Sequence, residues 1–417
     1  MIRRKVVVTG MGAISSLGFD VPSFWNGLMT GRCGVRRISQ FDPSAFTCQV
    51  AAEVPDYKAD DWFERRVVSR TARFSQFLLI AAREAWQQAG LPKEPQHDPR
   101  HAIVIGNGIG GLEVDSESHR KLFDKGPGRM PPMTIPRMIV NEGAGNLALE
   151  FGLGGRAHSI VTACSSGTDA IGHAMELIQF DKADLVLTGG VEAAITEFGL
   201  AAFCNLKALS THYNDTPEKA SRPFDRDRDG FVMGEGAGLL VLESEEHALA
   251  RGATILAEVA GYGATTDGFH LTAPDPTGSG AAAAFKMAMA DAQMTPADID
   301  YINAHGTGTD INDPTETAAI HAALGEHAAN VRISSIKGHI GHCLGAAGAL
   351  EAIASVLAIG NAMCPPTLNL DNVDDRCDLN YTPLTPVPAE IKAVLSSSLG
   401  FGGHNGVLAL RQYEPRR

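Results

Sequence analysis

Basic residues are scarce in this sequence of 417 residues, which has 35 Lys and Arg against 48 Asp and Glu and a formal net charge of −13. A protein that mainly binds nucleic acid needs a surplus of Lys and Arg to neutralise phosphates. The composition therefore excludes nucleic acid as the main partner. With 44% hydrophobic residues, the chain can still bury one large core or two medium ones.

Cysteines are also few, and their spacing is irregular. The seven lie at positions 33, 48, 164, 204, 343, 364 and 377, and no two form a C-x-x-C pair. An odd, scattered set excludes a disulfide framework or a zinc ribbon. It favours a reducing cytosol as the compartment.

Long apolar runs and a signal peptide are missing as well. No uninterrupted run reaches the ~20 residues that span a bilayer, and the most apolar region, Cys343 to Met363, is interrupted by Glu351 and several glycines. The N-terminus, MIRRKVVVTGMG, leads directly into an expected strand and a glycine turn. These features predict a cytoplasmic protein with no membrane insertion.

Short apolar runs alternate with helical patterns, which predicts an α/β fold with mostly buried sheets. The expected strands are KVVVTG, AIVIGNG, DLVLTGG, GLLVLE, YINAHG and AVLSSS. The expected helices cover residues 74–89, 170–178 and 346–359.

Two pairs of segments echo each other in the same order. Residues 8–13, VTGMGA, match residues 259–264, VAGYGA, and residues 238–242, GLLVL, match residues 406–410, GVLAL. Such glycine-apolar strings are common in α/β proteins, so the echoes alone leave a duplication of the chain open.

The segment GNGIGG, residues 106–111, satisfies the G-x-G-x-x-G pattern after an expected strand. A dinucleotide fold would follow it with a second strand ending in an acidic residue about 20 positions later. The chain continues instead as VDSESHRKLFDKGPGRMPP, which contains no such strand. We interpret the segment as a glycine loop that allows a close approach, without a nucleotide.

Two further segments imitate metal motifs. DRDRDG, residues 225–230, begins like a calcium loop, but the twelfth position is Gly236 rather than glutamate, so we expect a local ion-pair network. His339, His342 and Cys343 lie close in sequence but have no evident fourth ligand nearby, so the sequence predicts no metal site.

Three segments place a reactive side chain in a glycine-rich turn after a strand. They are TACSSG with Cys164, NAHGTGTD with His305, and KGHIGH with Lys337 and His342. A fourth segment, LGFGGHNG, could bring backbone N–H groups against a substrate. A lone buried cysteine or histidine is usually structural, but the joint occurrence of all four segments indicates an active site.

With these segments in view, the sequence resembles the elongating β-ketoacyl-[acyl-carrier-protein] synthases, in particular the type II condensing enzymes of fatty-acid synthesis. The resemblance extends along the chain through VVVTGMGAISSLG, TACSSG, SRPFDRDRDGFVMGEGAG, NAHGTGT, GHCLGAAGALEA and GFGG. It implies a thiolase-like α/β fold, with two pseudo-duplicated halves in five αβαβα layers, and a homodimer. It implies an N-terminal half, residues 1–250, with the nucleophile and a C-terminal half, residues 251–417, with the two histidines.

The resemblance also implies a mechanism. Cys164 would take an acyl group from acyl carrier protein, and the backbone N–H groups of Cys164 and Phe401 would bind the oxyanion. His305 and His342 would stabilise the enolate formed when malonyl carrier protein loses carbon dioxide, with Lys337 in support. Because a helix N-terminus lowers a cysteine pKa, we expect Cys164 to react as a thiolate.

Further residues match binding positions of the family. The expected substrate-binding group consists of Thr307 and Thr309 at the phosphopantetheine arm, Thr272 at the malonyl group, Ile109 on the acyl channel, and Glu351, the expected partner of Lys337. The expected basic docking surface for the acidic carrier protein comprises Arg66, Arg70, Arg129, Lys207 and Lys125. Phosphopantetheine would arrive on the carrier, and the enzyme itself would need no metal or nucleotide.

Two alternatives remain open at this stage. A ketosynthase of a type II polyketide or aryl-polyene pathway would use the same residues on a different acyl chain. A non-catalytic subunit that binds acyl carrier protein is disfavoured by the intact Cys164. Leu399, Met133 and Thr134 depart from the aromatic residues that we associate with these positions in the family, which leaves the preferred chain length open.

Overall fold

Ten strands form one continuous hydrogen-bonded sheet in the computed structural model, which describes residues 3–94 and 97–415. Their order across the sheet is β10-β9-β13-β14-β8-β1-β7-β6-β4-β5. Their bounds are β1 Val6–Ile14, β4 His101–Asn107, β5 Ala157–Ile160, β6 Leu185–Glu192, β7 Gly236–Ser244, β8 Ala257–Thr266, β9 Tyr301–Asn303, β10 Arg332–Ser334, β13 Ala393–Gly400 and β14 His404–Arg411.

The sheet consists of two halves with the same topology. In the order β5-β4-β6-β7-β1, the first two pairs are parallel and the next two antiparallel. The order β10-β9-β13-β14-β8 repeats this pattern pair for pair. The halves meet where β1 and β8 pair only at Val7 with Glu258 and Val8 with Ala257. The predicted duplication is therefore visible in the topology, while its boundary at residue 250 stays a prediction.

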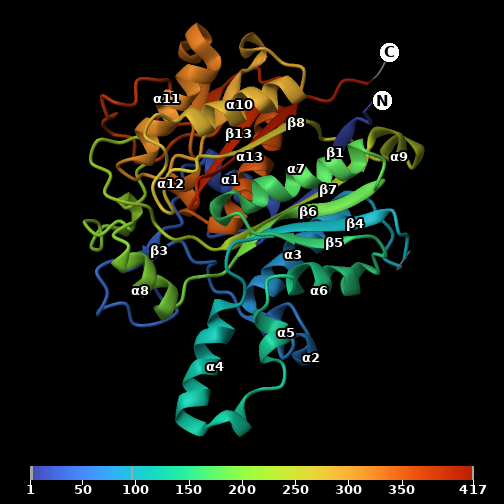
Figure 1. Cartoon of the computed structure of the whole chain (residues 1–417), viewed down its shortest axis with the longest axis vertical. Coiled ribbons are helices and arrows are strands. Elements are labelled where there is room, and N and C mark those ends of the chain that lie inside the picture. Colours follow the sequence, from blue (N-terminus) through green and yellow to red (C-terminus); the bar gives the residue numbers. More distant parts are fainter. Residues whose placement is uncertain (1–2, 95–96, 416–417) are drawn as a thin grey trace.

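Helices complete the layers (Figure 1). α3 (Arg73–Gln88) and α6 (Glu142–Phe151) pack on the outer face of the first half. α10 (Ser279–Asp291) packs on β8 and β14 of the second half, and α11 (Asn312–Leu324) packs on α10. α7 (Ser166–Gln179) and α13 (Ala347–Asn361) contact strands of both halves and each other. The predicted five-layered arrangement is thereby confirmed.

Close packing of helix on strand explains the sequence echo. At Gly10 and Gly12 of β1, an added Cβ would overlap backbone carbonyl oxygens of α3. At Gly261 and Gly263 of β8, an added Cβ would overlap backbone carbonyl oxygens of α10. The matching glycines therefore serve the same contact in each half.

Helix α13, with the short turn η7 (Leu344–Ala346) before it, is the most apolar stretch of the chain. Residues Leu344–Asn361 are long and apolar enough to cross a membrane by length and composition, but 83% of this window is buried inside the protein. It is therefore a core helix between the two halves.

The shorter elements surround this framework. They are α1 Val21–Met29, β2 Arg36–Arg37, β3 Val50–Ala51, α2 Arg65–Val68, α4 Leu112–Lys125, α5 Thr134–Met138, α8 Glu197–Asn205, α9 Glu245–Ala250, α12 Lys337–Ile340, β11 Met363–Cys364 and β12 Val387–Pro388. α4 and α5 project from the body of the molecule (Figure 1). The predicted strands and helices are all present, although the strand expected at YINAHG ends at Asn303.

Candidate active site

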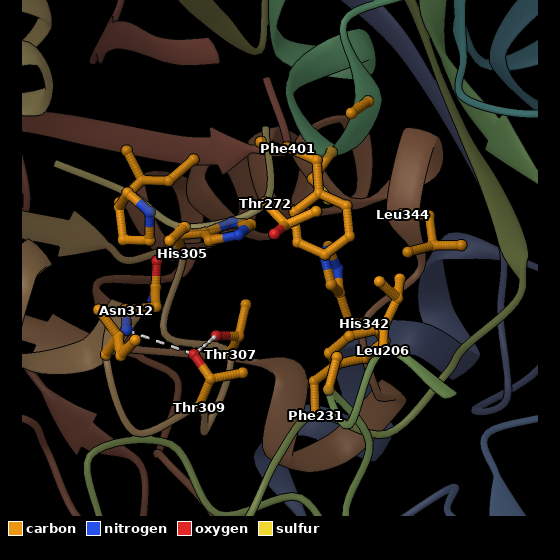
Figure 2. Close-up of a pocket in the computed structure, with 18 of the residues that line it drawn as sticks. Leu206, Phe231, Thr272, His305, Thr307, Thr309, Asn312, His342, Leu344 and Phe401 are labelled. Atoms are coloured by element: carbon orange, nitrogen blue, oxygen red, sulfur yellow. Dashed lines mark hydrogen bonds between the residues drawn. The ribbon is translucent and has the colours of Figure 1, made fainter. Parts of the chain in front are cut away.

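A cavity of about 530 Å³ is lined by residues from both halves. Its wall includes the following residues predicted from the sequence: Ile109, Cys164, Lys207, Thr272, His305, Thr307, Thr309, His342 and Phe401. The structure therefore brings together segments that lie up to 292 positions apart, from Ile109 to Phe401. Figure 2 shows His305, His342, Thr307 and Phe401 around a common space.

Cys164 lies in the turn η3 (Ala163–Ser165) that leads into α7, and it is buried. Ala163 has a φ of +52°, a left-handed conformation that is costly for a residue with a Cβ. The turn is held from the other half, since the Ser165 hydroxyl donates to the carbonyl of Ser398 at 3.1 Å. The predicted helix start is thus present. The turn before it has a strained backbone at Ala163 and is held in place by Ser165.

We expected the helix N-terminus to lower the pKa of Cys164, and for the net pKa of the thiol this prediction is wrong. Burial raises the pKa of Cys164 to about 11, although the backbone N–H of Phe401 and the charge of Lys337 lower it. Glu192 opposes ionisation with its own negative charge. Cys164 is therefore a neutral thiol near pH 7.

The glycine-rich turn after β13 supplies N–H groups to the same point. The backbone N–H groups of Phe401 and of Cys164 both act on the Cys164 sulfur. A Cβ on Gly400 would lie 3.2 Å from the Cys164 nitrogen, so a larger residue would push the two segments apart. Gly402 and Gly403 have φ of +86° and +76°, which residues with a Cβ rarely adopt. This geometry fits the predicted oxyanion site.

The two histidines face each other across the cavity. The centroids of the His305 and His342 rings are 5.1 Å apart, and the rings are nearly perpendicular at 87°. Burial lowers the pKa of both imidazoles well below the ordinary value, and the charge of Lys337 lowers both further. Both rings are therefore neutral near pH 7.

Lys337 determines which nitrogen of His305 carries the proton. Its ammonium forms a buried ion pair with Glu351 and lies 3.4 Å from Nδ1 of His305. An ammonium group can only donate, so Nδ1 must accept and Nε2 must carry the hydrogen. Lys337 and Glu351 do not line the cavity. Our grouping of Glu351 with the substrate-binding residues is therefore corrected: it holds Lys337 from behind the site.

A second buried carboxylate, which the sequence analysis missed, supports the His305 backbone. Glu316 in α11 accepts the N–H of His305 at 2.7 Å and of Gly306 at 2.8 Å. Burial raises the pKa of Glu316 to about 7, while these N–H groups oppose the shift. In the sequence, only its place in the DPTETAA run after NAHGTGTD could have drawn attention to it.

The threonines of the predicted arm-binding site lie together in the cavity wall. The hydroxyls of Thr307 and Thr309 are 3.1 Å apart (Figure 2). Arg228 of the DRDRDG segment donates to the Thr309 carbonyl at 2.9 Å and to Asp374 at 2.7 Å. The ion-pair network that we expected in this segment is confirmed, and it holds the threonine loop.

Two of the three departures from the family lie outside the cavity of this single chain. Leu399 lines the cavity and is 8% exposed. Met133 and Thr134 lie at the start of α5 and are not among the lining residues. Phe203, Phe231 and Leu344 also line the cavity, and the sequence had not singled them out.

The five expected docking residues are all exposed, and none forms an ion pair with a described carboxylate. They lie on or beside α2, at the end of α4 and the turn that follows it, and after α8: Arg66, Arg70, Lys125, Arg129 and Lys207. An ion pair of Arg120 with Glu197 joins α4 to α8. α5, which packs against α4, is joined to the segment just after α2, because Arg137 donates to the Thr71 carbonyl at 3.2 Å. The basic residues therefore lie on adjoining elements.

Comparison with protein families gives two matches. Residues 3–248 match the model of the beta-ketoacyl synthase N-terminal domain, and residues 256–371 match that of the C-terminal domain. The chain is 46% identical to "3-oxoacyl-[acyl-carrier-protein] synthase 2" of Synechocystis sp., with 99% of both chains covered. It is 44% identical to the protein of the same name from Coxiella burnetii, with 98% of this chain and 99% of the relative covered.

Solved structures show the same fold. A beta-ketoacyl synthase from Burkholderia phymatum superposes with a TM-score of 0.92 at 36% identity, covering 99% of this chain and all of that one. A type II polyketide ketosynthase, solved in complex with its acyl carrier protein and bound to a hexaketide, gives a TM-score of 0.90 at 34% identity, with 99% and 100% coverage.

Proposed function

We propose which residues perform each step of the reaction, given that the chain belongs to the beta-ketoacyl synthase family. Its activity is that of a 3-oxoacyl-[acyl-carrier-protein] synthase 2, an acyltransferase that condenses carrier-bound substrates. The observation that carries the proposal is the cavity in which Cys164, His305, His342 and the backbone of Phe401 meet.

In the first half-reaction, Cys164 takes the acyl group. Its sulfur attacks the thioester carbonyl of acyl carrier protein, the S–H proton leaves, and the carrier thiol is released. The backbone N–H groups of Cys164 and Phe401 stabilise the oxyanion, a contribution of about 10²–10³ in rate per donor in comparable sites. The proton ends on the released carrier thiol, and His342 is the neutral imidazole in the cavity that can carry it there, because Nδ1 of His305 already accepts from Lys337.

In the second half-reaction, the histidines stabilise an enolate. Malonyl carrier protein loses carbon dioxide, and the C–C bonding electrons move toward the thioester oxygen. His305 donates to that oxygen from Nε2, because Lys337 occupies Nδ1. His342, perpendicular to it, supplies the second donor. The enolate carbon then attacks the acyl-Cys164 carbonyl, the C–S bond to Cys164 breaks, the released thiolate takes up a proton, and 3-oxoacyl carrier protein leaves.

We propose acyl carrier protein as the partner that brings phosphopantetheine, with the exposed basic residues as its docking surface. Reversing Arg66 and Arg70 together to glutamate should raise the apparent KM for carrier-bound substrate by about tenfold at low salt and weaken its salt dependence. Steady-state kinetics at two salt concentrations measure both effects.

A double variant with the same charge change, Lys182→Glu with Lys286→Glu, is the control, because both residues are exposed and lie just after α7 and on α10, neither of which packs against α2, α4 or α8. Equal effects of the two double variants, or unchanged kinetics at low salt, would remove Arg66 and Arg70 from the docking surface.

Ile109 limits the acyl channel in this proposal. It is 37% exposed in the single chain and lines the cavity. Ile109→Phe should fold and keep activity on short acyl chains, but lose about one to two orders of magnitude on long ones, because the larger ring takes the space of distal methylenes. Rates on a ladder of acyl carrier proteins measure this; a uniform loss at every length would mean damaged packing instead.

We also propose a homodimer formed through β5. This strand ends the sheet, so one side of its backbone has no strand partner among the described residues. Two apolar side chains nearby are exposed, Leu149 at 84% and Val161 at 55%. A second copy would cover both. The odd number and irregular spacing of the cysteines support our inference of a cytosolic compartment.

A polyketide role is the second candidate, since a type II polyketide ketosynthase of 34% identity shares the fold. Relatives that are named as 3-oxoacyl synthases are more similar, at 43–46% identity. An assay with malonyl carrier protein and a ladder of acyl carrier proteins, resolved by mass, separates them. Fatty-acid function predicts one two-carbon extension of saturated acyl chains, whereas repeated extension of an unreduced product would favour the polyketide role.

A further inference from the structure

Glu192 is a fully buried carboxylate at the end of β6 that no step of the mechanism uses. Its hydrogen-bond partners are backbone N–H groups: Gly108 at 2.9 Å, Ile109 at 3.2 Å and Gly345 at 3.1 Å. It forms no ion pair with any described cation, and it lines the cavity. A buried charge held only by backbone donors is costly to keep, so it calls for a role at this site.

The fold brings three separate segments to this carboxylate. β4 and β6 are parallel neighbours, with Asn107 opposite Val191, so the loop after β4 lies beside the end of β6. Gly345 belongs to η7, which starts α13 from the facing layer. The carboxylate therefore joins a loop and a turn that are about 240 positions apart in the sequence.

Glycine at both contact positions is a requirement of this arrangement. A Cβ on Gly108 would lie 2.6 Å from Oε2 of Glu192, and a Cβ on Gly345 would lie 2.9 Å from the same atom. Any larger residue would push the carboxylate away from the N–H groups. We interpreted the GNGIGG loop as a loop without a nucleotide. Its backbone N–H groups bind the Glu192 carboxylate instead.

The residues that Glu192 fixes are the ones that shape the reaction. Its Oε1 atom accepts from the N–H of Ile109, whose side chain lies on the cavity wall. Its Oε2 atom accepts from Gly345, three positions after His342. Cys164 is close enough for the Glu192 charge to raise the pKa of the thiol.

We propose that Glu192 is a positioning residue, whose carboxylate locks the Ile109 loop to the segment after His342 and so sets the length of acyl chain that Cys164 accepts. This inference rests on the proposed function of the cavity. It adds a specificity determinant that acts through the position of the Ile109 loop rather than through contact with the substrate.

The test compares Glu192→Gln with the unaltered full chain. Glutamine keeps the size, but its NH₂ group cannot accept, so at least one backbone N–H loses its acceptor. We expect kcat/KM for a long acyl carrier substrate to fall by about tenfold, while that for a short one changes less than about threefold. Equal losses at all chain lengths would overturn the proposal.

Alkylation of Cys164 by iodoacetamide gives a readout that needs neither carrier nor condensation. Burial raises the pKa of Glu192 to about 7, so the side chain is mostly ionised at pH 8. Removing its charge should lower the pKa of Cys164, and the alkylation rate at pH 8 should rise by about threefold or more. An unchanged pH profile of alkylation would contradict the proposal even if the cavity has a different function.

Two further variants separate positioning from general stability. Glu84→Gln is the matched control, because Glu84 also accepts two backbone N–H groups, of Ala13 and Val21, has its pKa raised to about 7 by burial, and does not line the cavity. It should change neither readout. Glu192→Asp keeps the charge but shortens the reach, so it should alter the chain-length ratio without shifting alkylation. If Glu84→Gln reproduced both effects of Glu192→Gln, the proposal would fail.

Discussion

Replacing Cys164 by alanine should reduce condensation by at least about 10⁴-fold and abolish the acyl-enzyme, because no other cysteine lines the cavity in the described part of the chain. Incubation with acyl carrier protein followed by mass spectrometry detects the acyl-enzyme directly. The fold should survive, because the change deletes one sulfur atom from a turn anchored by Ser165 and Gly400. Circular dichroism and the melting temperature check this.

The control for this variant is Cys204→Ala. Cys204 is a half-buried free cysteine in α8 that does not line the cavity. It should elongate acyl chains at close to the unaltered rate. Should Cys164→Ala still condense at a near-normal rate, another nucleophile would have to be sought.

The second large effect is expected at the histidines. His305→Ala and His342→Ala should each slow the decarboxylation of malonyl carrier protein by about 10²–10⁴-fold, because each removes one donor to the enolate oxygen. Acylation of Cys164 should continue to some degree in both, since the oxyanion site is made of backbone N–H groups. Release of carbon dioxide and formation of acyl-enzyme are therefore measured separately.

Glutamine variants test whether the lost function is donation. The terminal NH₂ of glutamine can donate from a point near Nε2 of the replaced ring, so His305→Gln and His342→Gln should recover part of the decarboxylation lost in the alanine variants. Complete and equal loss of acylation in both alanine variants would contradict the division of labour proposed here.

Local sequence was sufficient to predict most of the framework. The strand and helix periods placed β1, β4, β6, β7, α3, α7 and α13 within a few residues of their observed bounds. Four strands of the sheet were not predicted. β5 and β10 have only four and three residues and pair with neighbours distant in the chain, and β8 and β14 were noticed only as echoes of β1 and β7. The echo around Gly10 and Gly261 was weak as a sequence signal but follows from the contact of each strand with a helix.

The sequence by itself predicted that Cys164, His305, His342 and the glycine turns form one site, because each lies in a short glycine-rich motif after an expected strand and these motifs resemble those of the family. Only the tertiary structure decided their states. Whether Cys164 is a thiol or a thiolate, and which nitrogen of His305 carries the proton, depends on burial and on contacts with residues far along the chain, such as Phe401 and Lys337. The role that we propose for Glu192 depends on the tertiary structure for the same reason, because its partners are backbone groups that separate segments bring together.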